Sequence, residues 1–108
     1  MIEIMKTCIW LDDIRTPRQI ENYAVIWCKN YQSVVDWINE HGLPNLIDFD
    51  HDLGEEKSGY DVAKFVVEYC MNHNTVLPHY HCHTANPVGR DNIEGLFESY
   101  NRFINENH

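Results

Sequence analysis

Acidic side chains gather directly after two apolar runs of this chain. Asp12 and Asp13 follow the run 8–11, and Asp50, His51 and Asp52 follow the run 46–49. If both runs are strands, their ends share the sheet edge at which open α/β folds bind ligands. Crowded carboxylates repel one another unless a cation neutralises them, and hard divalent cations prefer oxygen ligands. The pattern therefore predicts a divalent-metal site formed by Asp12, Asp13 and Asp50.

One acidic pair alone has an ordinary explanation, because aspartate also favours turns and helix caps. Two pairs at equivalent positions favour a functional site, since the carboxyl edge of such a sheet is where sites are built. Oxygen ligands indicate Mg²⁺ or Mn²⁺ as the cofactor, and Zn²⁺ is the alternative.

Three of the seven histidines alternate along one short segment. His79, His81 and His83 would lie on one face of a strand, because successive side chains point to opposite faces. His83 stands nearest the strand end and His51 lies between two acids, so these two are the best candidates for chemistry. They could ligate a transition metal or act in general acid–base catalysis, with Asp52 orienting or ligating.

The segment 84–90, after the last strand-like run, contains groups that suit phosphate binding. The amide of Gly89 at a helix start offers a donor and a favourable dipole, and Arg90 offers a planar fork for phosphate oxygens. Asn86 adds a polar side chain. Arg15 could be a second phosphate contact or an ion-pair partner of the nearby acids. Because N-P-x-G is also an ordinary turn, the loop alone does not indicate a phosphate site. It supports one only if it faces the acids and histidines.

Strand-like and helix-like patterns alternate along the chain. The predicted strands are 4–11, 24–28, 45–50 and 77–83, and the predicted helices are 16–22, 33–41, 58–70 and 86–104. Thr16 and Ser33 are expected N-caps, and Ser58 with Asp61 forms a capping box. Gly42 is expected to end the second helix, and the tail 105–108 is expected to fray.

The order βαβαβαβα predicts a doubly wound, parallel α/β sheet of about four strands with helices on both faces. At 108 residues, the chain is expected to form one domain over 1–108. The predicted strands end at the same edge of this sheet. The acids, His83 and the loop 84–90 should therefore meet there.

Composition narrows the range of partners. The net charge of −9, from 17 acids against 8 bases, argues against an extended nucleic-acid groove, which needs a basic surface. A small phosphorylated ligand or a nucleic-acid end remains compatible, because a bound metal can invert the local charge. No apolar run is long enough to span a membrane, and the first residues lack a signal-peptide pattern, so a cytoplasmic location is expected.

The four cysteines lie in apolar segments without metal-binding spacing. Reduced, buried thiols are therefore expected.

The combined motifs resemble a response-regulator receiver domain, and more closely the cyclic-phosphate processing receiver domains derived from it. The matching segments are Trp10 to Pro17 (W-L-D-D-I-R-T-P), Phe49 to Gly54 (F-D-H-D-L-G) and His83 to Arg90 (H-T-A-N-P-V-G-R). The resemblance implies a receiver-like fold, a phosphate-containing ligand and a phosphate contact from Thr84. The fifth strand of ordinary receivers, with its lysine, has no counterpart here, which argues against phosphorelay signalling.

Three functions follow from these expectations. The first is a small metal-dependent phosphoesterase for cyclic phosphates, with His51 and His83 as base and acid and with Asn86 and Arg90 stabilising the transition state. The second is a non-catalytic receiver-like module that binds a nucleotide or a protein partner. The third, a phosphoacceptor at Asp50, is the weakest because the lysine is missing.

Overall fold

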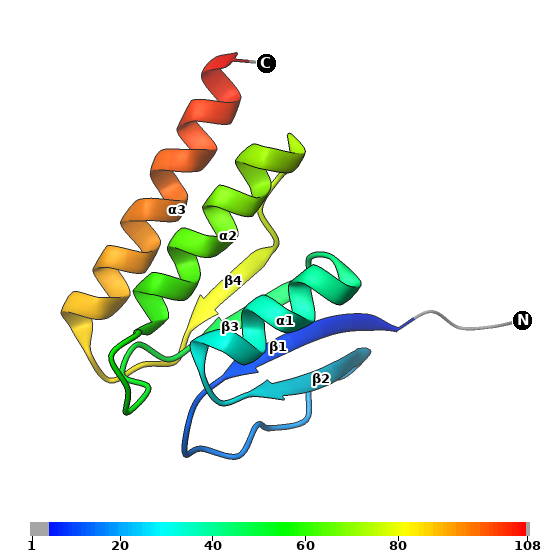
Figure 1. Cartoon of the computed structure of the whole chain (residues 1–108), viewed down its shortest axis with the longest axis vertical. Helices are drawn as coiled ribbons and strands as arrows, with labels where there is room; N and C mark the ends of the chain where they lie inside the picture. Colours follow the sequence, from blue (N-terminus) through cyan, green and yellow to red (C-terminus); the bar gives the residue numbers. More distant parts are fainter. Residues whose placement is uncertain (1–4, 108) are drawn as a thin grey trace, which may run out of the picture.

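A parallel sheet of four strands, ordered β2-β1-β3-β4, forms one layer of the molecule, and the helices form the other (Figure 1). This computed structural model describes residues 5–107, so the predicted strand start at residue 4 lies outside the described part. The strands are β1 (Lys6–Leu11), β2 (Tyr23–Cys28), β3 (Leu46–Phe49) and β4 (His79–Cys82), and the helices are α1 (Tyr31–His41), α2 (Gly59–His73) and α3 (Pro87–Asn107). The predicted α/β fold with four parallel strands and flanking helices is confirmed.

Side-chain caps fix the starts of α1 and α2. The Ser58 hydroxyl accepts from the Asp61 amide and the Asp61 carboxylate accepts from the Ser58 amide, which confirms the predicted capping box. At α1 the cap is Asn30, and Ser33 is its partner three residues on, so the predicted cap at Ser33 is wrong by one turn. Gly42, with a φ of 84°, ends α1 as predicted.

The chain direction decides which face of the sheet the helices cover. The connections β2-α1-β3 and β3-α2-β4 both run the same way across the sheet, and right-handed crossovers then place their helices on one face. Figure 1 shows α1, α2 and α3 on that side. The connection from β1 to β2 runs the opposite way, so a helix there would cover the other face.

The predicted helix at 16–22 is wrong: no helix occurs between β1 and β2. The Asp12 carboxylate accepts the amides of Ile14 and Arg15, and the Trp10 indole donates to the Arg15 carbonyl. These bonds hold the chain in a turn. The segment also lacks an apolar stripe to pack on the sheet, without which so short a helix is unstable. The prediction of helices on both faces fails with it, because the second face carries no helix among residues 5–107.

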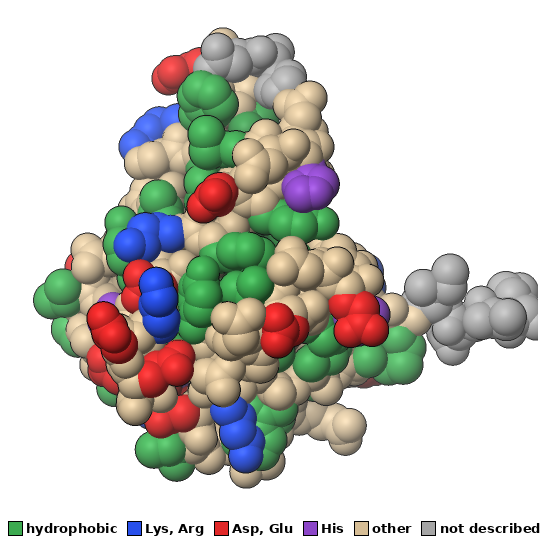
Figure 2. Space-filling view, viewed as in Figure 1, with side chains coloured by type: hydrophobic (Ala, Val, Ile, Leu, Met, Phe, Trp, Pro, Cys, Tyr) green, Lys and Arg blue, Asp and Glu red, His purple; other side chains and the backbone are tan. Residues whose placement is uncertain are grey.

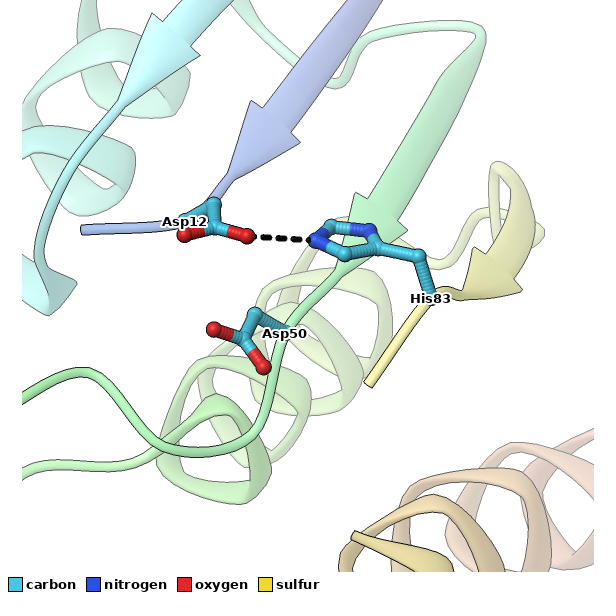
Figure 3. A group of neighbouring side chains, drawn as sticks. All are labelled: Asp12, Asp50 and His83. Atoms are coloured by element: carbon cyan, nitrogen blue, oxygen red, sulfur yellow. Dashed lines mark hydrogen bonds and ion pairs between the residues drawn. The ribbon is translucent and has the colours of Figure 1, made fainter. Parts of the chain in front are cut away.

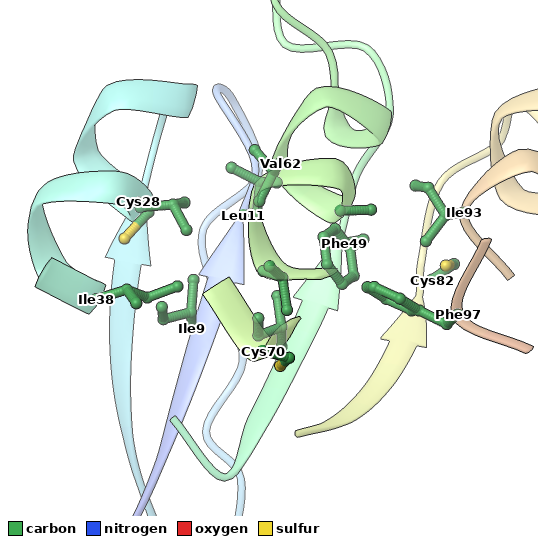
Figure 4. Packing of buried hydrophobic residues seen from close by; sticks show 14 of the residues in the cluster. Ile9, Leu11, Cys28, Ile38, Phe49, Val62, Cys70, Cys82, Ile93 and Phe97 are labelled. Atoms are coloured by element: carbon green, nitrogen blue, oxygen red, sulfur yellow. The ribbon is translucent and has the colours of Figure 1, made fainter. Parts of the chain in front are cut away.

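The two faces of the sheet have different rows of side chains. Leu11, Phe49 and Cys82 are register neighbours on the helix side and belong to the apolar core, together with residues of all three helices (Figure 4). The next row toward the strand starts faces the other side and contains Trp10, Asp48 and His81. The core therefore lies between the sheet and the helices.

Helix α3 extends further than the sequence suggests. It continues to Asn107, so residues 105–107 are helical rather than frayed, and residue 108 of the predicted tail lies outside the described part. Its apolar stripe is buried at Ile93, Phe97 and Tyr100, whereas Phe103 is 54% exposed.

Candidate functional site

The carboxyl ends of β1, β3 and β4 meet at one edge of the sheet, as expected from their parallel direction. A hollow of about 380 Å³ opens there. Its lining residues are Asp12, Asp13, Ile14, Arg15, Asp50, Asp52, Gly54, Thr84 and Ala85. Most residues that sequence reasoning assigned to a site are thus brought to one place.

Three side chains at this edge present potential ligand atoms to one another. One atom from each of Asp12, Asp50 and His83 lies within 4.8 Å of the others (Figure 3). Each residue directly follows a different strand. Asp13 is not part of this group, although it lines the same hollow. The structure therefore groups two of the three predicted metal ligands with a histidine.

His83 is held from three sides. Its Nδ1 donates to Asp48 Oδ1 at 2.7 Å, its Nε2 donates to Asp12 Oδ2 at 2.9 Å, and its ring stacks on Trp10 with centroids 4.1 Å apart. Because a carboxylate only accepts, both ring nitrogens carry protons in this arrangement. Burial alone would lower the pKa of His83, but the bonds to Asp48 and Asp12 raise it above its ordinary value.

Asp12 is buried and stabilised as a carboxylate. Burial alone would raise its pKa, but the amides of Arg15 and Ile14 donate to Oδ1 at 2.8 and 2.9 Å, and His83 donates to Oδ2. These bonds hold the pKa of Asp12 below its ordinary value. The backbone is fixed as well, since the Trp27 indole donates to the Asp12 carbonyl at 2.7 Å.

Asp50 has the opposite electrostatic balance. Burial and the neighbouring Asp12 raise its pKa, although it accepts the His51 amide at 2.8 Å and a hydrogen bond from Thr84. A carboxylate whose charge is disfavoured is one that a cation would stabilise. The donor set of two carboxylates and one imidazole therefore fits a divalent ion.

His51 lies apart from the three-residue group, in the loop after β3. Its Nδ1 is 3.1 Å from Asp52 Oδ1 and 3.4 Å from Asn86 Nδ2. Gly89 packs directly on the ring: a Cβ at this position would overlap the Cβ, Cγ and Cδ2 atoms of His51. The glycine of the last loop is thus required by the close approach of His51, a role that the sequence reading did not foresee.

The predicted phosphate contacts support the turn between β4 and α3. Arg15 Nη1 donates to the His83 carbonyl at 3.2 Å, and Arg90 Nη2 donates to the Thr84 carbonyl at 2.8 Å. Asn86 Oδ1 accepts the Gly89 amide at 3.0 Å. Each guanidinium has five N–H donors, so one carbonyl bond is compatible with phosphate binding.

Sequence reasoning missed Asp48. It is only 3% exposed and lies within β3, where it binds His83 and His81. The signal was an acid inside the apolar run Leu46-Ile47-Asp48-Phe49, since buried acids require partners. The alternating histidines of β4 were the matching donors.

Other parts of the surface offer less chemistry. A hollow of about 410 Å³ between the ends of α2 and α3 has no acidic, basic or imidazole group in its lining. On the face shown in Figure 2, Lys and Arg side chains do not join into a continuous patch. No helix among residues 5–107 is long and apolar enough to cross a membrane.

A parallel α/β sheet with acids after its first and third strands defines a receiver-like domain. The chain belongs to the cyclic-phosphate processing receiver domain family, whose sequence model matches residues 7–99. No curated protein matches the chain.

Among solved structures, the chain is similar to a fusion protein whose description names the yeast Spc42 trimeric coiled coil, amino acids 181–211, as one of its parts. The TM-score is 0.59 at 19% identity, and the match covers 84% of this chain and 60% of that chain. At this identity the likeness shows the fold alone.

Proposed function

We propose that this domain is a metal-dependent phosphoesterase that opens cyclic phosphates, such as 2′,3′-cyclic nucleotides or nucleic-acid ends. The observation that carries the proposal is the convergence of Asp12, Asp50 and His83 at the edge of the sheet. The family's link to cyclic-phosphate processing supports the substrate class. The hollow beside the three residues leaves room for a phosphate group.

Asp12, Asp50 and Nε2 of His83 would hold the cation. Carboxylate ligands suit Mg²⁺ and Mn²⁺, whereas an imidazole ligand favours Mn²⁺ or Zn²⁺. When bound, the ion supplies a Lewis acid for a phosphoryl oxygen. Asp13 lines the hollow and adds negative charge that favours the cation.

The remaining groups bind the phosphate and move protons. Arg15 and Arg90 neutralise phosphate charge with the donors that their carbonyl bonds leave, and Thr84 contributes a hydroxyl beside Asp50. His51, held by Asp52, acts as the general acid–base group next to the hollow.

The test is hydrolysis of a 2′,3′-cyclic nucleotide by the full chain with Mg²⁺, Mn²⁺ or Zn²⁺. Asp50→Asn and His83→Gln should abolish turnover while circular dichroism shows an intact fold. Asp36→Asn, which neutralises an exposed acid of α1, is the matched control and should retain full activity. Wild-type protein that cleaves no such substrate with any of these metals would contradict the proposal.

Ligand binding without turnover is the second candidate. It is favoured by the internal use of Arg15, Arg90 and Asn86, which already bond to the backbone of the turn. A cyclic nucleotide that raises the melting temperature and is recovered unchanged by mass spectrometry would support this reading over the enzyme.

A further inference from the structure

Asp48 is a buried carboxylate on the sheet face that no described helix covers, and the proposed chemistry does not use it. It is 3% exposed, and burying such a group costs free energy unless it is paired. Both of its partners bind the same oxygen: Nδ1 of His83 at 2.7 Å and Nδ1 of His81 at 3.0 Å. The side chain of His83 is 8% exposed, and that of His81 is 58% exposed. The inner contact is therefore the shielded one.

This contact determines which nitrogen of His83 faces the site. With Nδ1 donating to Asp48 and the ring stacked on Trp10, Nε2 points to Asp12. A neutral imidazole has one N–H and one lone pair. In the arrangement described above both nitrogens carry a proton; a cation held by Asp12 and Asp50 would displace the proton on Nε2, and the acceptor fixed at Nδ1 would then leave the lone pair on Nε2.

We propose that Asp48 is a positioning residue, which fixes the tautomer and orientation of His83 so that Nε2 is presented to a cation at Asp12 and Asp50. The cation itself rests on the proposed function. Metal-bound histidines generally donate their other N–H to a carboxylate or carbonyl, and loss of that partner weakens metal affinity by about 10- to 100-fold.

The first experiment measures Mn²⁺ affinity of the full chain by calorimetry. Asp48→Ala should weaken binding by about 10- to 100-fold. Asp48→Asn should lose less, because its amide oxygen still accepts from Nδ1. His81→Ala removes the other donor to the same oxygen and should leave the affinity unchanged. Wild-type protein and Asp48→Ala binding Mn²⁺ equally would overturn the inference and leave the proposed function intact.

The second experiment reads the tautomer directly, by long-range ¹H–¹⁵N NMR of the histidine ring without metal and with Zn²⁺. In the wild type, Nδ1 of His83 should carry a proton in both states. In Asp48→Ala this preference should weaken, and Asp48→Leu, which also removes the acceptor but fills the buried space, replaces that variant if it fails to fold. If wild-type protein binds no metal, the proposed function fails, but a protonated Nδ1 that depends on Asp48 still supports the positioning role. A wild-type Nδ1 without a proton would overturn it.

Discussion

The two faces of the sheet are built from the same four strands but by different physical means. On the helix side, the row Leu11, Phe49 and Cys82 is apolar and packs beneath α2 and α3. On the other side, the row one residue earlier contains Asp48 and His81. The buried carboxylate of Asp48 is stabilised by hydrogen bonds from His81 and His83, and Trp10 in the same row stacks on the His83 ring.

The comparison shows how one strand can serve stability and function at once. Neighbours in β3 alternate between faces, so Phe49 fills the core while Asp48 orients a histidine of the site. Because the period is two, a register shift of one residue would exchange these environments. The register of β3 against β4 is therefore a requirement of both the core and the site.

The largest loss of unfolding free energy should follow from truncating a buried side chain on the helix side of the sheet. Phe49 is fully buried and contacts Phe97, with ring centroids 5.6 Å apart. Phe49→Ala should lower the free energy of unfolding by about 3–5 kcal/mol, because it removes apolar contacts and leaves a cavity. Urea unfolding measures this loss. Phe103→Ala, at a side chain that is 54% exposed, is the matched control and should cost less than about 1 kcal/mol. Equal losses would contradict the assignment of the core.

The same contrast explains what the sequence could predict. Strand runs, the capping box at Ser58 and the stop at Gly42 depend on neighbouring residues, so they could be found. The failed helix at 16–22 had good local signals, but side-chain bonds from Asp12 and Trp10 stabilise a turn instead.

The residues of the site also fall into those that local sequence patterns predict and those that depend on contacts between distant segments. Asp12, Asp50 and His83 could be predicted because each follows a strand, and parallel strands end together. The role of Asp48 depends on its register against a strand more than 30 residues away, which no local pattern gives. The carbonyl bonds of Arg15 and Arg90 likewise depend on how the ends of β1 and β4 approach one another.

Cysteine labelling compares solvent access on the two faces of the sheet. The face without helices is called the open face here. Burial raises the pKa of Cys8, on the open side, and of Cys82, on the helix side, from 9.0 to about 11. Both thiols should therefore react with iodoacetamide at least about 100-fold more slowly than an unperturbed thiol, since the thiolate is the reactive form. Mass spectrometry after timed labelling measures both rates. Fast labelling of Cys8 alone would mean that the open face leaves the thiol of Cys8 in β1 accessible to the reagent.

The pH dependence of stability should come from the polar cluster. The raised pKa of His83 gives stability that is present below its ordinary value of 6.5 and is lost as pH rises through its folded pKa. The raised pKa of Asp50 acts in the same direction, from 3.8 upward. The lowered pKa values of Asp12 and Asp48 give stability that is present above 3.8 and lost as pH falls.

The metal-free protein should therefore lose stability above pH 6.5. Urea unfolding with a chelator, at about pH 6 and about pH 8, measures this change. His83→Gln removes the titrating ring and should flatten the dependence, whereas Phe49→Ala should lower the whole curve without changing its slope. An unchanged slope in His83→Gln would show that the cluster does not control it.

The smallest change in unfolding free energy should come from replacing His81, the exposed histidine on the open face. His81 shares one oxygen of Asp48 with His83, but its side chain is 58% exposed and solvent screens the pair. His81→Ala should therefore change the free energy of unfolding by less than about 1 kcal/mol. Asp48 keeps its shielded bond to His83 in this variant, so no buried carboxylate is left without a donor. A loss of unfolding free energy comparable to that of Phe49→Ala would mean that His81 and His83 stabilise Asp48 jointly. The stability of the open face would then depend on the exposed side chain of His81.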